Sequence, residues 1–147
     1  MENLGSVMAD TSRMMRRAFD ARARVIGVTR PQWQVLSVLV RHEGINQGGL
    51  AEQLDVEPIS VCRMIDRLQE AGLVERRADL ADRRSWRLHL TPRAHGLLAR
   101  LRPLAEVMIE EALESIDAGE RATLLRLLEQ VRENLSRRQS EQSASDG

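Results

Sequence analysis

The stretch Asp79-Leu80-Ala81-Asp82-Arg83-Arg84-Ser85 decides the fold of this chain, because it is a charged turn between two short segments that have the pattern of strands. The first segment runs from Leu73 to Arg77 and the second from Trp86 to Leu90. In the second, Trp86, Leu88 and Leu90 alternate with two polar residues, which is the period of a strand that buries one face. The sequence therefore predicts a β-hairpin whose tip projects into solvent.

The segment before the hairpin, Pro58 to Ala71, has the period of a helix. Its apolar side chains fall on one side and several polar ones on the other. A helix with a basic face, followed by a hairpin with a basic tip, suggests a device that grips a polyanion. The apolar side holds Val61, Ile65 and Leu68, and the polar side holds Ser60, Arg63 and Arg67.

Another short helix is expected just upstream. Asn46 is a plausible N-cap for a helix from Gln47 to Leu54, and Asp55-Val56-Glu57 provides the turn that leads into the next helix. Gly48 and Gly49 weaken this short helix by about 1 kcal/mol each relative to Ala, so it should depend on its neighbours. Two short helices joined by such a turn form a helix-turn-helix, and Gly72 would close the second helix.

Helical periodicity also predicts a long first helix from about Val7 to Ile26, which stops at Gly27. Thr29 and Gln32 then have the spacing of a capping box, so a second helix should run from about Pro31 to His42. The apolar face of this second helix is expected to hold Trp33, Leu36 and Val40.

Two further helices should follow the hairpin. Thr91-Pro92 repeats the pattern of a cap followed by proline and predicts a helix to about Ser115. Asp117 and Glu120 form another capping box, which starts a last helix, and we expect the polar tail from Ser136 to Gly147 to be frayed. Leucines on most of the last helix's circumference imply two packing partners, so a homodimer of intertwined terminal helices is the economical arrangement. Those leucines are Leu124, Leu125, Leu127 and Leu128.

Composition narrows the class of protein. The chain has 147 residues, of which 42% are hydrophobic and 2% aromatic, so an aliphatic core is expected. Its single cysteine, Cys62, excludes an internal disulfide; without a signal peptide or a run of about 20 apolar residues, we expect a cytoplasmic protein with no membrane association. His42, His89 and His95 lack metal-ligand spacing, and no catalytic constellation can be assembled, so we expect no metal, no cofactor and no enzymatic activity.

The formal net charge is zero, which argues against a nucleic-acid-binding protein until its distribution is considered. From Pro58 to Arg93 the chain has eight Arg and five acidic residues, whereas from Ala94 to Gly147 it has seven Arg and ten acidic residues. The excess of positive charge therefore lies on the predicted helix and hairpin. All 22 basic residues are Arg, which binds phosphate or guanine through paired N–H donors, although a bias in genomic base composition would have the same effect.

These elements and motifs, in this order, resemble the MarR family of bacterial regulators from about Met8 to Leu135. Each motif is weak alone, and their conjunction is specific. Asp82, Arg84 and Arg87 fit the Asp-x-Arg-x-x-Arg pattern of the family's wing. Cys62, where Thr or Ser is more usual, and the Gly48-Gly49 pair are departures. The motifs are Thr29-Arg30-Pro31-Gln32-Trp33, Leu50-Ala51-Glu52, Val61-Cys62-Arg63-Met64-Ile65-Asp66-Arg67-Leu68, Gly72-Leu73-Val74-Glu75-Arg76, Asp82-Arg83-Arg84-Ser85-Trp86-Arg87 and Leu90-Thr91-Pro92.

The resemblance implies a mainly α fold with a small β-hairpin wing, that is, a winged helix-turn-helix with long N- and C-terminal dimerisation helices. It also implies a homodimeric transcriptional repressor, or occasionally an activator, that binds a pseudo-palindromic double-stranded DNA operator and is released by a small aromatic or anionic effector. The expected parts are a dimerisation helix (1–28), a DNA-binding domain (29–92), C-terminal dimerisation helices (93–138) and a disordered tail (139–147).

Helical geometry selects the residues that would contact DNA. Arg63 lies nearly opposite the buried Val61 and can donate to both O6 and N7 of a guanine. In the wing, Arg84 is the candidate for a narrow A·T-rich minor groove, oriented by Asp82. For Arg76 and Arg77, at the base of the hairpin, a structural ion pair and a DNA contact both stay open. The full set of predicted DNA contacts is Ile59, Ser60, Arg63, Arg67, Asp82, Arg83, Arg84 and Arg87.

The effector site is expected where the dimerisation helices meet the DNA-binding lobe, although most of its candidate residues are more simply explained as core residues. Two alternative functions stay open. One is a redox sensor, in which oxidation of Cys62 beside Arg63 blocks DNA binding, against the simpler interpretation of a small packed residue. The other is a winged-helix scaffold that binds proteins. The candidate effector residues are Arg13, Met15, Arg16, Phe19, Trp33, Leu36, Val40 and His42.

Overall fold

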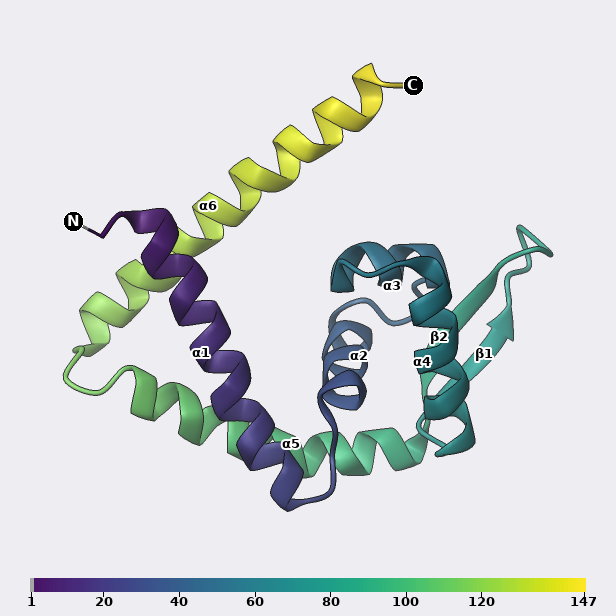
Figure 1. Cartoon of the computed structure of the whole chain (residues 1–147), viewed down its shortest axis with the longest axis horizontal. Coiled ribbons are helices and arrows are strands. Elements are labelled where there is room, and N and C mark those ends of the chain that lie inside the picture. Colours follow the sequence, from purple (N-terminus) through teal and green to yellow (C-terminus); the bar gives the residue numbers. More distant parts are fainter. Residues whose placement is uncertain (1) are drawn as a thin grey trace. The chain divides into compact units, whose positions relative to one another are not determined.

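The computed structural model describes residues 2–147 and confirms the predicted fold class, with six helices and one antiparallel hairpin in this part of the chain (Figure 1). The chain divides into two compact units, one ending at Met108 and the other comprising Ile109–Gly147, and each is described by itself. The elements are α1 (Leu4–Val25), α2 (Arg30–Arg41), α3 (Gln47–Leu54), α4 (Pro58–Glu70), β1 (Val74–Ala78), β2 (Trp86–Leu90), α5 (Pro92–Ala112) and α6 (Ala118–Ser145).

The predicted caps begin the helices. The side chain of Thr29 accepts the N–H of Gln32 while Gln32 Oε1 accepts the N–H of Thr29, which is a complete capping box at the start of α2. Asp117 and Glu120 form the second one, at the start of α6. Because these side chains satisfy N–H groups that have no partner inside the helix, each fixes where its helix starts.

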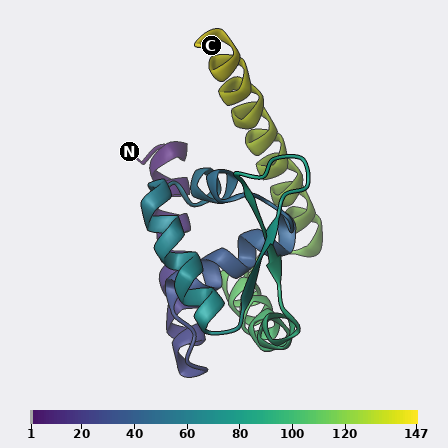
Figure 2. The same ribbon diagram turned by 90° about the vertical axis from the view of Figure 1, so that its right-hand side faces the viewer.

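The core of the first unit lies between α2, α3, α4 and the hairpin. Leu36 and Leu39 of α2, Leu50 of α3, Ile65 of α4 and Leu88 of β2 are fully buried. These residues come from all parts of the helix-turn-helix and the wing, so one core holds α4 and the hairpin in a fixed relation. Figure 2 shows α4 beside the hairpin, with α2 behind them.

The hairpin has a third short strand-like neighbour. Val74 pairs with Leu90 and Ala78 with Trp86, which sets the antiparallel register of β1 and β2. On the other edge of β2, the N–H of Gly44 donates to the carbonyl of Leu88 at 2.9 Å, and the N–H of Leu88 donates to the carbonyl of Ile45 at 3.0 Å. The connection between α2 and α3 therefore covers the edge of the wing, which secures the wing's base.

Three expectations differ from the structure. Trp86 is 48% exposed, although the alternation predicted it to be buried with Leu88 and Leu90, because it pairs with exposed Ala78 at the end of β2 away from the core. Val40 is 49% exposed, because the buried face of α2 is centred on other residues, Val35, Leu36, Val38 and Leu39.

The third difference concerns the C-terminal tail. The tail was expected to fray from Ser136 and to be disordered over 139–147, yet α6 continues to Ser145. A helix already nucleated at Asp117 extends at low cost through residues such as Arg, Gln and Glu, which favour helix even without burial. The hydroxyls of Ser140 and Ser143 also donate to carbonyls one turn earlier, at 3.1 Å each.

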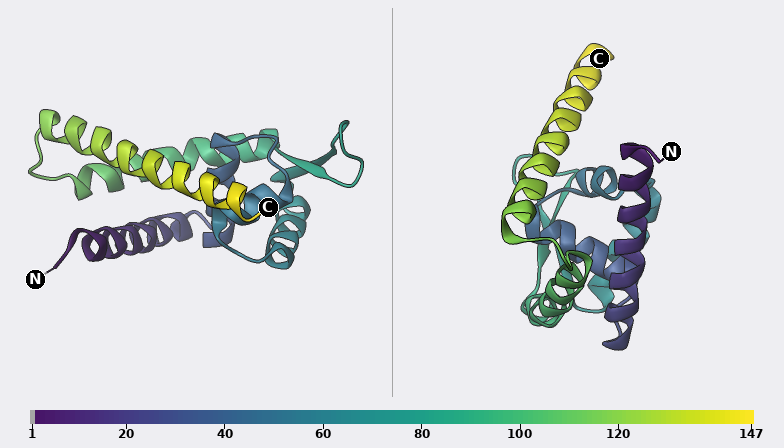
Figure 3. Two further views of the ribbon diagram at one scale, coloured as in Figure 1. Left: turned by 90° about the horizontal axis from the view of Figure 1, so that it is seen from above. Right: turned by 90° about the vertical axis from the view of Figure 1, so that its left-hand side faces the viewer.

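The second unit contains the end of α5, a turn and α6, which Figure 3 shows as one long helix. Arg121 fastens the turn: its Nε donates to the carbonyl of Ile116 and its Nη2 to that of Leu113, at 2.8 and 2.9 Å, and it pairs with Glu110 at 2.8 Å. The leucines of α6 are exposed in the single chain, with Leu125 at 61% and Leu135 at 56%.

Candidate nucleic-acid interface

Helix α4 presents two different faces. Val61, Ile65 and Leu68 are buried, as the helical period predicted. The candidate DNA-contacting residues lie on the opposite face and are exposed, and Ile59, near the start of the helix, is 61% exposed. A helix held by its apolar face, with an accessible basic face, can be laid into a major groove. The exposed candidates are Ile59, Ser60, Arg63 and Arg67.

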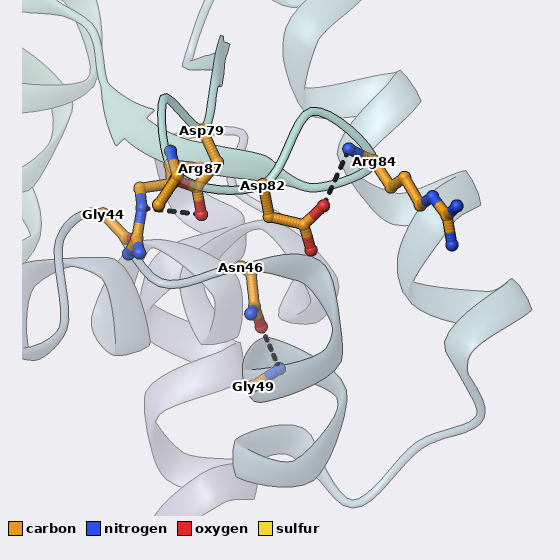
Figure 4. Close-up of polar contacts among 8 residues, drawn as sticks. Gly44, Asn46, Gly49, Asp79, Asp82, Arg84 and Arg87 are labelled. Atoms are coloured by element: carbon orange, nitrogen blue, oxygen red, sulfur yellow. Dashed lines mark hydrogen bonds and ion pairs between the residues drawn. The ribbon is translucent and has the colours of Figure 1, made fainter.

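Short-range hydrogen bonds shape the wing tip. Asp79 Oδ1 accepts the N–H of Ala81 at 2.9 Å, and Asp82 Oδ1 accepts the N–H of Arg84 at 3.0 Å (Figure 4). The N–H of Ser85 donates to the carbonyl of Asp82 at 3.0 Å. Two aspartate side chains thus stabilise successive turns by mimicking backbone acceptors, so the tip is an ordered loop.

The arginines of this region fall into two groups. Within residues 2–147, no hydrogen bond or ion pair holds the guanidinium groups of Arg63, Arg67, Arg83 or Arg84. These four lie on the outer face of α4 and at the wing tip, and Figure 4 shows the Arg84 side chain directed away from the loop. Their donors are available to a ligand, and all four are predicted DNA contacts.

Arg87 belongs to the second group. Its Nε pairs with Asp79 Oδ2 at 3.2 Å and its Nη1 donates to the carbonyl of Gly44 at 2.9 Å, so it joins the wing to the connection between α2 and α3 (Figure 4). The backbone N–H of Ala81, followed by the charge of Arg87, holds the pKa of Asp79 below its usual range. Sequence reasoning missed Asp79, although an acid eight residues before an Arg across a hairpin is a detectable signal.

Arg76 also has internal partners. Its side chain is 17% exposed, pairs with Asp66 at 2.7 Å, and donates to Gln47 at 3.0 Å and to Gln69 at 2.7 Å. These contacts link β1 to both helices of the helix-turn-helix. Of the two alternatives left open for Arg76, the structure supports the structural ion pair. Nearby, Cys62 is half-buried, and its carbonyl accepts a 3.4 Å hydrogen bond from Arg76.

The candidate effector residues lie in different surroundings, some in the core and others on the surface. Phe19 and Trp33 pack edge to face with ring centroids 4.9 Å apart, and Leu36 is fully buried in the core. Arg13 pairs with Asp10 on the surface of α1, and Arg16 donates to Ser12 at 2.7 Å. Met15 is half-buried and His42 is exposed beyond the end of α2.

An electrostatic contact joins α1 to α2 beside the aromatic pair. Asp20 is paired with Arg30, and its Oδ1 accepts the indole N–H of Trp33 at 2.7 Å. The hydrogen bond from Arg30, as the largest cause, lowers the pKa of Asp20. Trp33 is therefore positioned by a structural contact as well as by packing, which sequence reasoning did not anticipate.

A cavity of about 250 Å³ lies between the end of α2, β2 and α5. Of the eight candidate effector residues, Val40 is the one that lines it. The half-exposed Val40 thus forms part of an apolar wall that also carries a cationic group, an imidazole and a carboxylate. The other lining residues are Glu43, Leu90, His95, Leu98, Ala99 and Arg102.

Residues 2–147 lack two kinds of feature, a cluster of metal-ligating side chains and a membrane-spanning helix. No group of three or more His, Cys, Asp and Glu side chains that could hold a metal ion occurs there. Nor does any helix in the same range combine the length and the apolar composition that crossing a bilayer requires.

Known proteins have similar sequences and structures. The MarR family pattern matches residues 26–85. The chain is 32% identical over 135 residues to a protein of Thauera aromatica named as a putative transcriptional regulatory protein for the hcr operon. The matched region covers 86% of this chain and 81% of that protein. A MarR transcriptional regulator from Methanosarcina mazei is 28% identical, with a TM-score of 0.81 over 91% of this chain and 96% of that one. Mutant MarR from E. coli complexed with operator DNA is 26% identical, with a TM-score of 0.72 over 87% of this chain and 92% of that one.

The hairpin beside a helix-turn-helix, together with these similarities, defines a winged helix-turn-helix transcriptional regulator of the DNA-binding type. The chain belongs to the MarR family. The family and its structural neighbours are transcriptional regulators and not enzymes.

Proposed function

We propose that this regulator is a repressor that binds a pseudo-palindromic operator as a homodimer in the cytoplasm and is released by a small anionic effector. The division of the arginines carries the proposal. Arg63, Arg67, Arg83 and Arg84 have free guanidinium groups, whereas Arg76 and Arg87 have internal partners. Unpaired guanidinium groups on the helix and tip that would face DNA are the expected donors for phosphates and base edges.

The two surfaces divide the recognition. Helix α4 enters the major groove, where Arg63 donates to guanine, Ser60 to a phosphate or base edge, and Ile59 contacts a thymine methyl group. The wing follows the phosphate backbone to the adjacent minor groove, where Arg84 is inserted and Arg83 holds a phosphate. Arg87 keeps one terminal nitrogen, Nη2, for a phosphate contact, because its other donors serve the wing.

Dimerisation is supported by the exposed apolar residues of both terminal helices. In α1, Leu4 is 72% and Met14 62% exposed, and in α6 Leu125 is 61% exposed. Surfaces of this kind are covered in a stable protein, and a second copy of the same chain supplies matching helices. A two-fold axis then separates the recognition helices by about 34 Å, one turn of B-DNA.

The cavity between α2, β2 and α5 supports effector binding. Arg102 and His95 offer cationic or N–H donor groups to a carboxylate, and Val40, Leu90 and Leu98 offer an apolar wall to a ring. A ligand bound there releases DNA only if it prefers a form of the dimer whose helix spacing does not fit the operator.

Retention of genomic DNA fragments by the purified full-length protein at physiological salt tests this function. We expect a small set of fragments with two protected half-sites about 10 base pairs apart in hydroxyl-radical footprints. Retained DNA should be released by an aromatic carboxylate such as salicylate, and Arg102→Ala should weaken release without weakening DNA binding. A protein-binding scaffold would retain no fragment in a salt-sensitive manner.

A further inference from the structure

Leu80, at the wing tip, is the feature of the molecule that the proposed function does not use. Its side chain is 100% exposed, more than any other large apolar residue in the described part of the chain. The next in order, Val25 at 84% and Leu4 at 72%, lie on α1, where a second copy is expected to cover apolar surface. Leu80 has no such explanation, because it stands on the loop at the wing tip, between Asp79 and Ala81.

The backbone on both sides of Leu80 is fixed. Asp79 accepts the N–H of Ala81 at 2.9 Å through its side chain, and the N–H of Asp79 donates to the carbonyl of Ser85 at 3.2 Å. The loop therefore holds Leu80 outward, whereas a flexible loop would let the side chain fold back on the hairpin. In Figure 3, the tip that carries it extends past α4.

Leu80 and Arg84 belong to the same seven-residue loop, Asp79–Ser85, and neither side chain is held by the rest of the chain, so a wing tip that enters a groove brings both residues to it. The minor-groove floor of an A·T pair presents only acceptor atoms and leaves space above them. A G·C pair adds the guanine N2 amino group, which projects into the groove and needs an acceptor. Leucine supplies no acceptor and occupies the space, so its presence disfavours G·C by shape and by loss of a hydrogen bond.

We propose that Leu80 is a specificity-determining residue, which enters the minor groove beside Arg84 and selects A·T over G·C at the base pairs under the wing. The inference rests on the proposed DNA-binding function and adds a sequence preference to it. Arg84 responds to the negative potential of the groove, and Leu80 responds to the presence of the amino group. The two contributions are separable because the guanine amino group can be removed without changing the major groove.

Inosine makes that separation. The duplex is a fragment retained by the wild-type protein, and the wing positions are those whose minor-groove protection disappears in Arg84→Ala. At these positions the A·T pairs are replaced by G·C or by inosine·cytosine, which lacks the amino group. For the wild type we expect A·T and inosine·cytosine to bind alike, and G·C to bind at least about fivefold more weakly.

Leu80→Ser should reduce the difference between G·C and inosine·cytosine to less than about twofold. Leu80→Met, the matched control, should keep it, because an apolar side chain of similar size remains. Both variants should fold as the wild type does, since Leu80 is buried by nothing in the chain. A Leu80→Ser protein with wild-type discrimination, or a wild type that binds G·C and inosine·cytosine equally, would overturn the inference alone. Failure to retain any DNA would overturn the proposed function as well.

Discussion

The carboxylate of Asp82 accepts the backbone N–H of Arg84 at 3.0 Å, and this contact fixes the chain at the wing tip while leaving the Arg84 guanidinium free. The sequence suggested that Asp82 orients Arg84, and the orientation acts through the backbone. The presence of an acid in a loop that we propose to contact DNA is thereby explained, because its oxygen is needed as an acceptor in the turn.

Asp82→Asn and Asp82→Ala should therefore differ. Asn keeps the side-chain oxygen that accepts the Arg84 N–H, so DNA affinity should change by less than about twofold. Ala removes the acceptor and loosens the turn. DNA affinity should then fall by about three- to tenfold, because the lost hydrogen bond contributes about 1 kcal/mol to the order of the loop. Fluorescence anisotropy with one labelled operator fragment measures both. Equal losses in the two variants would show that the negative charge, not the turn, is what DNA binding requires.

Arg76 is expected to matter for stability, and Arg77, its neighbour on β1, is the matched control. Arg76→Ala removes contacts to α3 and α4 and should lower the free energy of unfolding by about 1–3 kcal/mol. Arg77 is 53% exposed and pairs with Glu75 on its own strand, so Arg77→Ala should cost less than about 0.5 kcal/mol. Urea unfolding at one fixed protein concentration checks this. Similar losses for both would mean that Arg76 does not join the hairpin to the helices.

The two glycines of α3 should respond in opposite ways to substitution by Ala. A Cβ at Gly49 would lie 2.8 Å from Ile45 Cγ1, whereas at Gly48 its nearest neighbour is Asn46 Oδ1, at 3.6 Å. Gly48→Ala should raise the free energy of unfolding by up to about 0.5 kcal/mol through helix propensity, and Gly49→Ala should lower it by about 1 kcal/mol or more. Thermal unfolding of the two variants distinguishes these signs; a gain at both positions would mean that Ile45 moves aside freely.

Sequence patterns were sufficient for the elements and insufficient for the contacts between them. Capping residues such as Thr29 and Asp117 act within one turn of helix, so the helix starts were predicted correctly. Gly49 was expected only to weaken α3, because the sequence does not show that the side chain of Ile45 lies against it. Trp86 was misassigned because alternation identifies a face of the strand but not how far the core extends along it.

The candidate site shows the same limit. The exposed face of α4 follows from the 100° step of a helix and was placed correctly on that basis. The partners of Arg76 and Arg87 come from distant parts of the chain, such as Gln47 and Gly44, and no local pattern could separate these arginines from Arg83 and Arg84. The cavity likewise depends on how α5 packs near the end of α2, which no local pattern reveals. Of the candidate effector residues, only Val40 lines it.

Asp20 should contribute to the dependence of stability on pH. Its pKa in the folded protein is lowered, chiefly by the hydrogen bond from Arg30. A lowered pKa favours the folded state above the unfolded value of about 3.9, and this contribution is lost as the pH falls through the folded value. Asp20→Asn should therefore be less stable than the wild type by a constant amount above about pH 5, with the difference shrinking below about pH 4.

Unfolding at a series of pH values measures that difference, and Asp10→Asn is the control, because Asp10 pairs with Arg13 at an exposed position. A difference for Asp20→Asn that stays constant down to pH 2 would show that the ionised carboxylate gives no added stability.

The division between free and engaged arginines is the central claim, and the salt dependence of DNA affinity tests it most directly. The full-length protein is titrated with one retained fragment between about 50 and 200 mM salt. Arg83→Ala and Arg84→Ala should each make the slope of log affinity against log salt shallower by about 1, while Arg77→Ala should leave it unchanged. If the Arg77 variant alters the slope as much as the two tip variants do, or if none of them does, the assignment of the wing tip as the DNA-contacting surface is wrong.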